Sequence, residues 1–240
     1  MPAPGETFQG YTLEERVPRP EGAVTEAFLA RDRSGEQVLV ELVREGATSV
    51  EKARFGLRAR RLLGVQHPAL IAAREASATW SVLEHPAGVP LSEHAGLAIA
   101  RARQKLAWVA QIAAAIARLH KGGIVHGDVT LDAIVVSAGA TVKLLVPLSA
   151  DVSRVPLDDV RALAFATCTL VLGSQTGSIL EDVVRARVHD AGVAPEAAAV
   201  VARVCAGGSM SSEDFAQRLA PFADFAGPTT EPLLPVVPRR

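Results

Sequence analysis

The pattern of apolar and polar positions makes residues 11–83 rich in strand signals. Short runs of apolar and β-branched residues recur there between turn-forming residues, and one stretch with helical spacing interrupts them. The sequence DRSG at residues 32–35 is typical of a hairpin turn between two such runs. We therefore predict strands at residues 28–30, 37–43 and 80–84 and a helix at residues 50–63.

After residue 85 the apolar positions recur with the spacing of helices. The segment 104–120 has apolar residues around its whole circumference, which indicates a helix buried on most sides. The sequence SSED at residues 211–214 is typical of a helix start, because a serine side chain can cap the first backbone N–H groups. Residues 227–240 hold four prolines and few apolar anchors, so we expect disorder there. We predict helices at residues 104–120, 158–172, 195–205 and 211–219.

Composition narrows the function classes. With 240 residues, 49% of them hydrophobic, the chain can bury a substantial core as one large domain or two small lobes. A net charge of −1 means that basic residues are not in excess, so we expect no nucleic-acid partner. The N-terminus has no apolar core of a signal peptide, and the longest apolar run, residues 162–173, is too short to span a bilayer. Cys168 and Cys205 lack metal-ligand spacing. We expect a soluble, cytoplasmic protein with reduced thiols and no membrane contact.

Residues 119–145 hold the most informative motif. A buried helix there runs into a Gly-rich turn, then into the sequence HGD at residues 126–128, and then into two short β-branched runs. This segment resembles the catalytic-loop region of the protein kinase family, whose pattern is H-R-D-L-x-x-x-N followed by a strand and D-F-G. His126 and Asp128 stand where the histidine and the catalytic aspartate of that pattern belong.

Other segments match kinase motifs in the right order: VLVE at residues 38–41, HPALI at 67–71, LEH at 83–85 with Leu83 as the gatekeeper, and DVRALA at 159–164. The resemblance covers residues 11–222 and implies an α+β, two-lobed kinase-like fold with a truncated activation segment. In this reading residues 1–10 are an N-terminal tail and residues 227–240 a flexible Pro-rich tail. The β-rich N-lobe spans residues 11–84 and the helical C-lobe residues 85–226. An unrelated α+β domain is the alternative.

The positions that handle phosphate in kinases are altered. Only Gly22 remains of the Gly-rich loop, at residues 20–25, and Glu41 replaces the lysine that contacts the α- and β-phosphates. Two unit charges about 4 Å apart interact by about 4 kcal/mol at an effective dielectric near 20, so this reversal should cost several powers of ten in phosphate affinity. Arg58 stands where helix C carries the glutamate that pairs with that lysine. We predict a reversed Glu41–Arg58 ion pair; the alternative is that both side chains face solvent.

The metal-binding positions are altered too. Ala133 replaces the metal-binding asparagine and Val146 the D-F-G aspartate, and neither side chain offers the oxygen ligand that Mg²⁺ requires. We therefore expect no metal site and no cofactor. The resemblance implies a structural role for the vestigial His126 and Asp128 together with Asp159, and we expect the Asp128 carboxylate to accept hydrogen bonds from the loop backbone.

A kinase scaffold without this chemistry is expected to be a pseudokinase, a catalytically inactive domain that acts as a protein-interaction or regulatory module. One alternative is a weak or atypical ATP-dependent phosphotransferase of the Ser/Thr kinase type with Asp128 as its base; another is a metal-independent nucleotide sensor. The Ala-rich composition fits a bacterium of high GC content. If phosphorylated, Thr230 with Leu233 three residues later resembles a ligand of forkhead-associated domains, although the tail can equally be unmodified.

Overall fold

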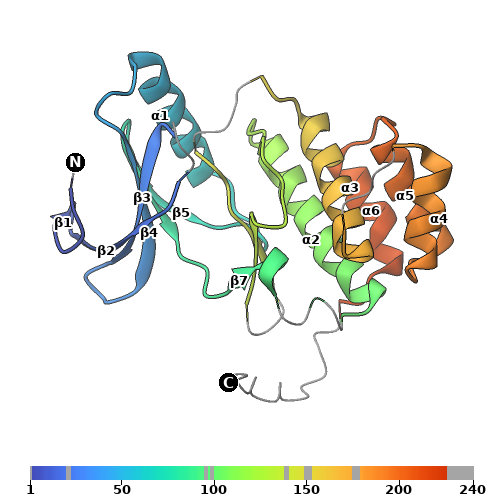
Figure 1. Cartoon of the computed structure of the whole chain (residues 1–240). Helices are drawn as coiled ribbons and strands as arrows, with labels where there is room; N and C mark the ends of the chain where they lie inside the picture. The colour runs from blue at the N-terminus through green and yellow to red at the C-terminus, as the bar shows by residue number, and fades with distance from the viewer. Residues whose placement is uncertain are drawn as a thin grey trace, which may run out of the picture.

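The chain forms a β-rich part followed by a helical part (Figure 1). The computed structural model describes residues 2–19, 23–94, 97, 100–137, 141–148, 153–174 and 179–225. The predictions for Gly22, for Thr230 and for the tail at residues 227–240 therefore lie outside the described residues. The first part, the N-lobe, holds β1 to β6 and α1; the second, the C-lobe, holds the elements from β7 onward.

The N-lobe is a six-stranded antiparallel sheet with the order β1-β2-β3-β4-β6-β5. Its strands are β1 (Thr7–Phe8), β2 (Tyr11–Val17), β3 (Thr25–Arg31), β4 (Gln37–Val43), β5 (Ala73–Ala76) and β6 (Trp80–Glu84). The predicted hairpin joins β3 to β4, where the Asp32 carboxylate accepts hydrogen bonds from the backbone N–H groups of Ser34 and Glu36 at 2.8 and 2.9 Å. These bonds fix the turn as an Asx-type turn, and the register of β3 on β4 follows from it.

Alternation along β4 decides where Glu41 points. Val38, Val40 and Leu42 belong to a small core cluster on one face of the sheet. Glu41 and Val43 point to the opposite face, because neighbouring side chains of a strand alternate. Val43 joins the main core there, so Glu41 lies on the face that is covered by the rest of the protein.

Helix α1 (Ser49–Leu63) follows β4 after a short connection. A capping box explains why the helix begins at Ser49. The Thr48 hydroxyl accepts a hydrogen bond from the Glu51 backbone N–H, and the Glu51 carboxylate accepts one from the Thr48 N–H. Phe55 and Leu62 are buried in the main core. The helix predicted at residues 50–63 is confirmed.

The C-lobe holds a small antiparallel sheet and a group of helices. The sheet has the order β7-β8-β9, and β8 and β9 are the two short β-branched runs after the HGD sequence. The elements are β7 (Val89–Pro90), η1 (Leu91–Glu93), α2 (Ala102–Lys121), β8 (Ile134–Val136), β9 (Val142–Leu144), α3 (Pro156–Leu172), α4 (Glu181–Asp190), α5 (Pro195–Cys205), α6 (Ser212–Leu219) and η3 (Ala220–Phe222). All four predicted helices are confirmed, whereas α4 was not predicted.

One apolar core connects the two lobes. The largest buried cluster includes Phe55 of α1 and Leu83 of β6 together with Ile116 of α2 and Leu163 of α3. A shared core of this kind opposes movement of one lobe against the other, because such movement would expose apolar surface to water. Cys168 and Cys205 are free thiols in this core. Among the helices that the structure describes, none has both the length and the apolar character to cross a membrane.

Candidate functional site

The HGD loop is held by Asp159, which lies near the start of α3. Its carboxylate is buried and accepts hydrogen bonds from the backbone N–H groups of His126 and Gly127, both at 2.7 Å. His120, near the end of α2, contributes a third hydrogen bond from Nε2 at 2.8 Å. Burial by itself would raise the pKa of Asp159, but these three hydrogen bonds outweigh it and hold the pKa below its ordinary value. Asp159 is therefore ionised, and its carboxylate acts as a clamp that holds the loop through these hydrogen bonds.

His126 is also a structural residue. Its Nε2 donates to the carbonyl oxygen of Leu145 at 2.6 Å, and its Nδ1 accepts from the backbone N–H of Asp128 at 3.2 Å. These partners require the neutral imidazole with its proton on Nε2. Burial lowers the pKa of His126, which favours the same neutral form. The structural role that the resemblance implied for His126 and Asp159 is confirmed.

The expectation for Asp128 is wrong. Its side chain is exposed, and within the described part of the chain its carboxylate accepts no hydrogen bond and forms no ion pair. The backbone bonds that we assigned to Asp128 go to Asp159 instead. Asp159 receives them because it is buried beneath the loop, whereas the Asp128 side chain points to solvent.

Glu41 is buried in the middle of β4, with 2% of its surface exposed. Its carboxylate forms an ion pair with the guanidinium of Arg19, a residue that follows β2 and precedes residues 20–22. Burial raises the pKa of Glu41, against the attraction of Arg19 and Arg58, which lowers it. One oxygen of Glu41, Nε of Arg19 and the hydroxyl of Ser81, which neighbours Glu41 on β6, have no hydrogen-bond partner among the described residues.

Arg58 of α1 connects the N-lobe to the HGD loop. Its guanidinium donates to three backbone carbonyl oxygens, those of Pro147 at 2.6 Å, Val125 at 2.7 Å and His126 at 3.1 Å. Burial lowers the pKa of Arg58 to about 10, so the side chain stays protonated at neutral pH. We call this set of bonds the Arg58 latch.

The predicted Glu41–Arg58 ion pair is therefore wrong. Both side chains are at least partly buried, so the solvent-facing alternative is wrong as well. Among the described residues, the cation within 4 Å of the Glu41 carboxylate is Arg19. Arg58 instead donates to three backbone carbonyl groups, which a guanidinium can do because it has five N–H donors. The positive charge of Arg58 still acts on Glu41, because it opposes the rise in the pKa of that carboxyl.

Comparison with known proteins identifies the family. A model of the protein tyrosine and serine/threonine kinase family matches residues 20–150, which is more than half of the chain. The chain belongs to the protein kinase family. A search of curated proteins found no match.

In this member of the protein kinase family, the residues at the metal positions carry no oxygen ligand in their side chains. Val146, in place of the D-F-G aspartate, is buried in the core, and Ala133 packs against the same core. Within the described residues, no cluster of three or more histidine, cysteine, aspartate or glutamate side chains could hold a metal ion. Leu83, at the gatekeeper position, is buried and pairs with Leu39 of β4.

The activation segment of this family member is short. Val146 and Leu148 are buried, and only residues 149–155 separate Leu148 from the start of α3. A surface pocket of about 660 Å³ opens beside the HGD loop, lined by residues 129–132 and by the α3 residues Phe165 and Thr169. Among the lining residues that the structure describes, Asp132 is the charged one, so this described lining offers no cation to a phosphate.

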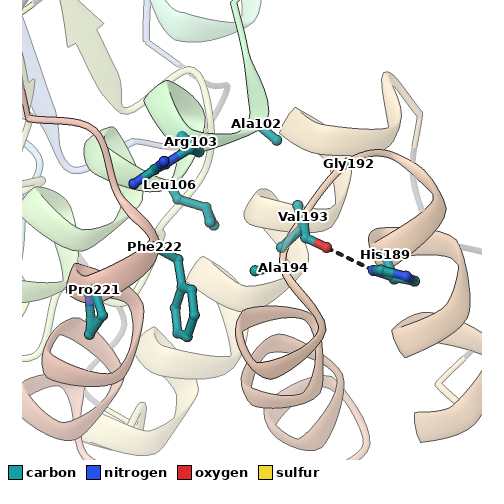
Figure 2. A pocket seen from close by; sticks show the side chains of 9 residues that line it. All are labelled: Ala102, Arg103, Leu106, His189, Gly192, Val193, Ala194, Pro221 and Phe222. Carbon is teal, nitrogen blue, oxygen red and sulfur yellow. Dashed lines mark hydrogen bonds between the residues drawn. The ribbon is translucent and has the colours of Figure 1, made fainter.

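A second pocket, of about 430 Å³, lies at the opposite end of α2 from the HGD loop (Figure 2). Leu106 of α2, Val193 and Phe222 give it a largely apolar lining, and Arg103 and His189 stand at its edges. His189 donates from Nδ1 to the carbonyl oxygen of Val193 at 3.0 Å. None of the described residues that line this pocket belongs to one of the kinase motifs.

Proposed function

We propose that this kinase family member is a pseudokinase, a catalytically inactive domain that acts in the cytoplasm of a bacterium as a protein-interaction or regulatory module. The observation that carries the proposal is the buried Glu41–Arg19 ion pair at the position of the phosphate-binding lysine. In an active kinase that position presents a lysine, whose positive charge contacts the phosphates of the nucleotide. Here the same position presents the Glu41 carboxylate, and the cation that pairs with it, Arg19, belongs to the same chain.

The chemistry of phosphoryl transfer explains why this substitution matters. A kinase does little covalent work and depends on positive charge and metal ions placed around the phosphates. A carboxylate at the lysine position repels those phosphates, and Ala133 and Val146 offer no ligand for the Mg²⁺ that would screen the repulsion. Asp128 could still accept a proton, but a base without an aligned phosphate has no reaction to catalyse.

The Arg58 latch supports a role as a scaffold. In this chain α1 is attached to the C-lobe through three backbone carbonyls and through a shared apolar core. Both attachments are made by groups of the protein itself and need no nucleotide. We therefore propose that the two lobes keep one relative arrangement, which suits a surface that partner proteins recognise.

Melting temperature in the presence of nucleotide tests the proposal. The protein is heated with ATP alone, with Mg²⁺ alone, with both and with neither, beside an active kinase as a positive control. Binding at about 1,000 times the dissociation constant would add about 4 kcal/mol of stability, or roughly 8 °C or more for a chain of this length. We expect no shift with ATP under either condition. A shift that requires Mg²⁺ would favour the phosphotransferase, and a shift without Mg²⁺ the nucleotide sensor; either result would overturn the proposal.

Substitution of Asp128 is expected to have little effect. Because its side chain is exposed and has no partner among the described residues, Asp128→Asn should change the melting temperature by less than about 2 °C. Thermal unfolding followed by circular dichroism measures this directly. A loss of several degrees would mean that the carboxylate does hold the loop.

A further inference from the structure

The outer face of α1 is unusual because apolar side chains lie exposed between arginines. Val50 and Leu57 are 55% and 48% exposed, and Ala53 lies between them on the same side of the helix, at a spacing of three and four residues. Arg54 and Arg61 follow one edge of this stripe. We call these residues, with Arg60 on the other edge, the α1 face.

One arginine of the α1 face has an acidic neighbour on the same helix, since the charge of Arg54 helps to lower the pKa of the Glu51 carboxyl. Among the described residues, Arg54, Arg60 and Arg61 form no ion pair within 4 Å, although Arg61 donates to the carbonyl oxygen of Gly123. Arg60 and Arg61 lie in the last turn of α1, where their positive charge interacts favourably with the negative end of the helix dipole. Neither the helix dipole nor the neighbouring Glu51 explains the exposed apolar stripe.

The start of α4 has the opposite character. Ile179, Leu180 and Val183 are 67%, 66% and 40% exposed, and Glu181 and Asp182 lie among them. We call these five residues the α4 face. Like the α1 face it has three apolar side chains beside charged ones, but its charges are acidic. Asp182 also forms an ion pair with Arg185 of the same helix, at 2.6 Å. Glu181 is therefore the residue of the α4 face whose negative charge is more available to a partner.

We propose that the α1 face of one molecule binds the α4 face of a second copy. The two faces are complementary, since each exposes three apolar side chains and the charges beside them are of opposite sign. In Figure 1, α1 and α4 lie at opposite ends of the molecule, so they cannot meet within one chain. The contact is therefore heterologous and continues from copy to copy, as a ring or as a chain. It goes beyond the proposed function because it needs no assumption about the nucleotide cleft.

Association through these faces is expected to be weak. A stable interface buries about 800 Å² on each partner, more than three apolar side chains supply, so we expect a dissociation constant of about 10–100 µM. The charges should make the association weaken as salt is added, because exposed ion pairs are screened. Sedimentation of the full chain over about 1–300 µM, at low and at high salt, measures both effects.

Charge reversal identifies the faces. Arg54→Glu with Arg61→Glu makes both faces acidic, and Glu181→Lys with Asp182→Lys makes both basic. Each variant alone should self-associate at least tenfold more weakly than the unmodified protein. An equal mixture of the two should recover the association, because each then meets a face of opposite sign. Arg154→Glu and Glu196→Lys, single reversals at exposed positions of the C-lobe, serve as controls and should leave association unchanged.

Recovery of association in the mixture would also show that both variants are folded, since two misfolded variants could not complement each other. The inference is overturned if the unmodified protein is monomeric throughout the range, or if it associates and neither variant weakens the association. It is also overturned if the chain stays monomeric and its α1 face instead binds vesicles of phosphatidylserine and phosphatidylcholine. None of these outcomes depends on the melting test with ATP, so failure of this inference and failure of the proposed function are distinguishable.

Discussion

Replacing Arg58 with methionine is expected to lower the free energy of unfolding by about 2–4 kcal/mol, because three backbone carbonyls lose their donors at once. Methionine matches the unbranched stem of arginine as far as Nε and removes the donor groups, so the loss reports the hydrogen bonds more than the packing of the stem. Water can reach some of the vacated space, since Arg58 is only partly buried, and this limits the loss. Chemical denaturation at neutral pH measures the change.

Two further variants define what the Arg58 latch contributes. Arg54→Met makes the same substitution at an exposed position of the same helix, where we expect a change within about 0.5 kcal/mol. Arg58→Lys keeps the charge but has a shorter, unforked head that cannot reach all three carbonyls, so its loss should be intermediate. Equal small losses for Arg58→Met and Arg54→Met would mean that the latch does not hold the lobes together.

Much of the fold could be predicted from local signals. The turn at residues 32–35 set the β3–β4 hairpin because Asp32 caps its own turn, and α2 could be located because apolar residues surround it. Helix α4 lacked such a signal. Only Val184 and Val188 of α4 are buried, and its other positions are largely charged, so the apolar periodicity is too weak to mark it.

The candidate site was predicted in part, and the error over Glu41 has a physical cause. Motif order placed Asp159 and His126 correctly, because the spacing along the chain fixes their contacts with one loop. Opposite charge at Glu41 and Arg58 suggested a pair, but charge alone does not determine which groups come within reach. Arg19 competes for Glu41 from an irregular segment after β2, and no periodicity in the sequence indicates where such a side chain points.

Replacing Asp159 with asparagine is expected to destabilise the protein by about 3 kcal/mol or more. The two carboxylate oxygens accept from His126, Gly127 and His120, whereas asparagine has one oxygen and turns its NH₂ group toward at least one of these donors. A buried donor that faces another donor loses its hydrogen bond and gains a repulsion. Asp158→Asn is the matched control. Asp158 is the neighbouring residue, and among the described residues it accepts a hydrogen bond from the Val155 N–H alone, at the helix start, so we expect a loss of about 1 kcal/mol or less.

The pH dependence of the same variant separates a lost charge from lost packing. Because the folded protein holds the pKa of Asp159 below its ordinary value, the ionised clamp contributes its full stability above about pH 4, the pKa of an aspartate in an unfolded chain. That contribution is lost as the pH falls through the lower, folded-state pKa. The difference in unfolding free energy between the unmodified protein and Asp159→Asn should therefore be largest at neutral pH and shrink below about pH 4. A difference that stays constant from pH 7 into the acid range would mean that Asp159 stabilises the loop by shape and not as a carboxylate.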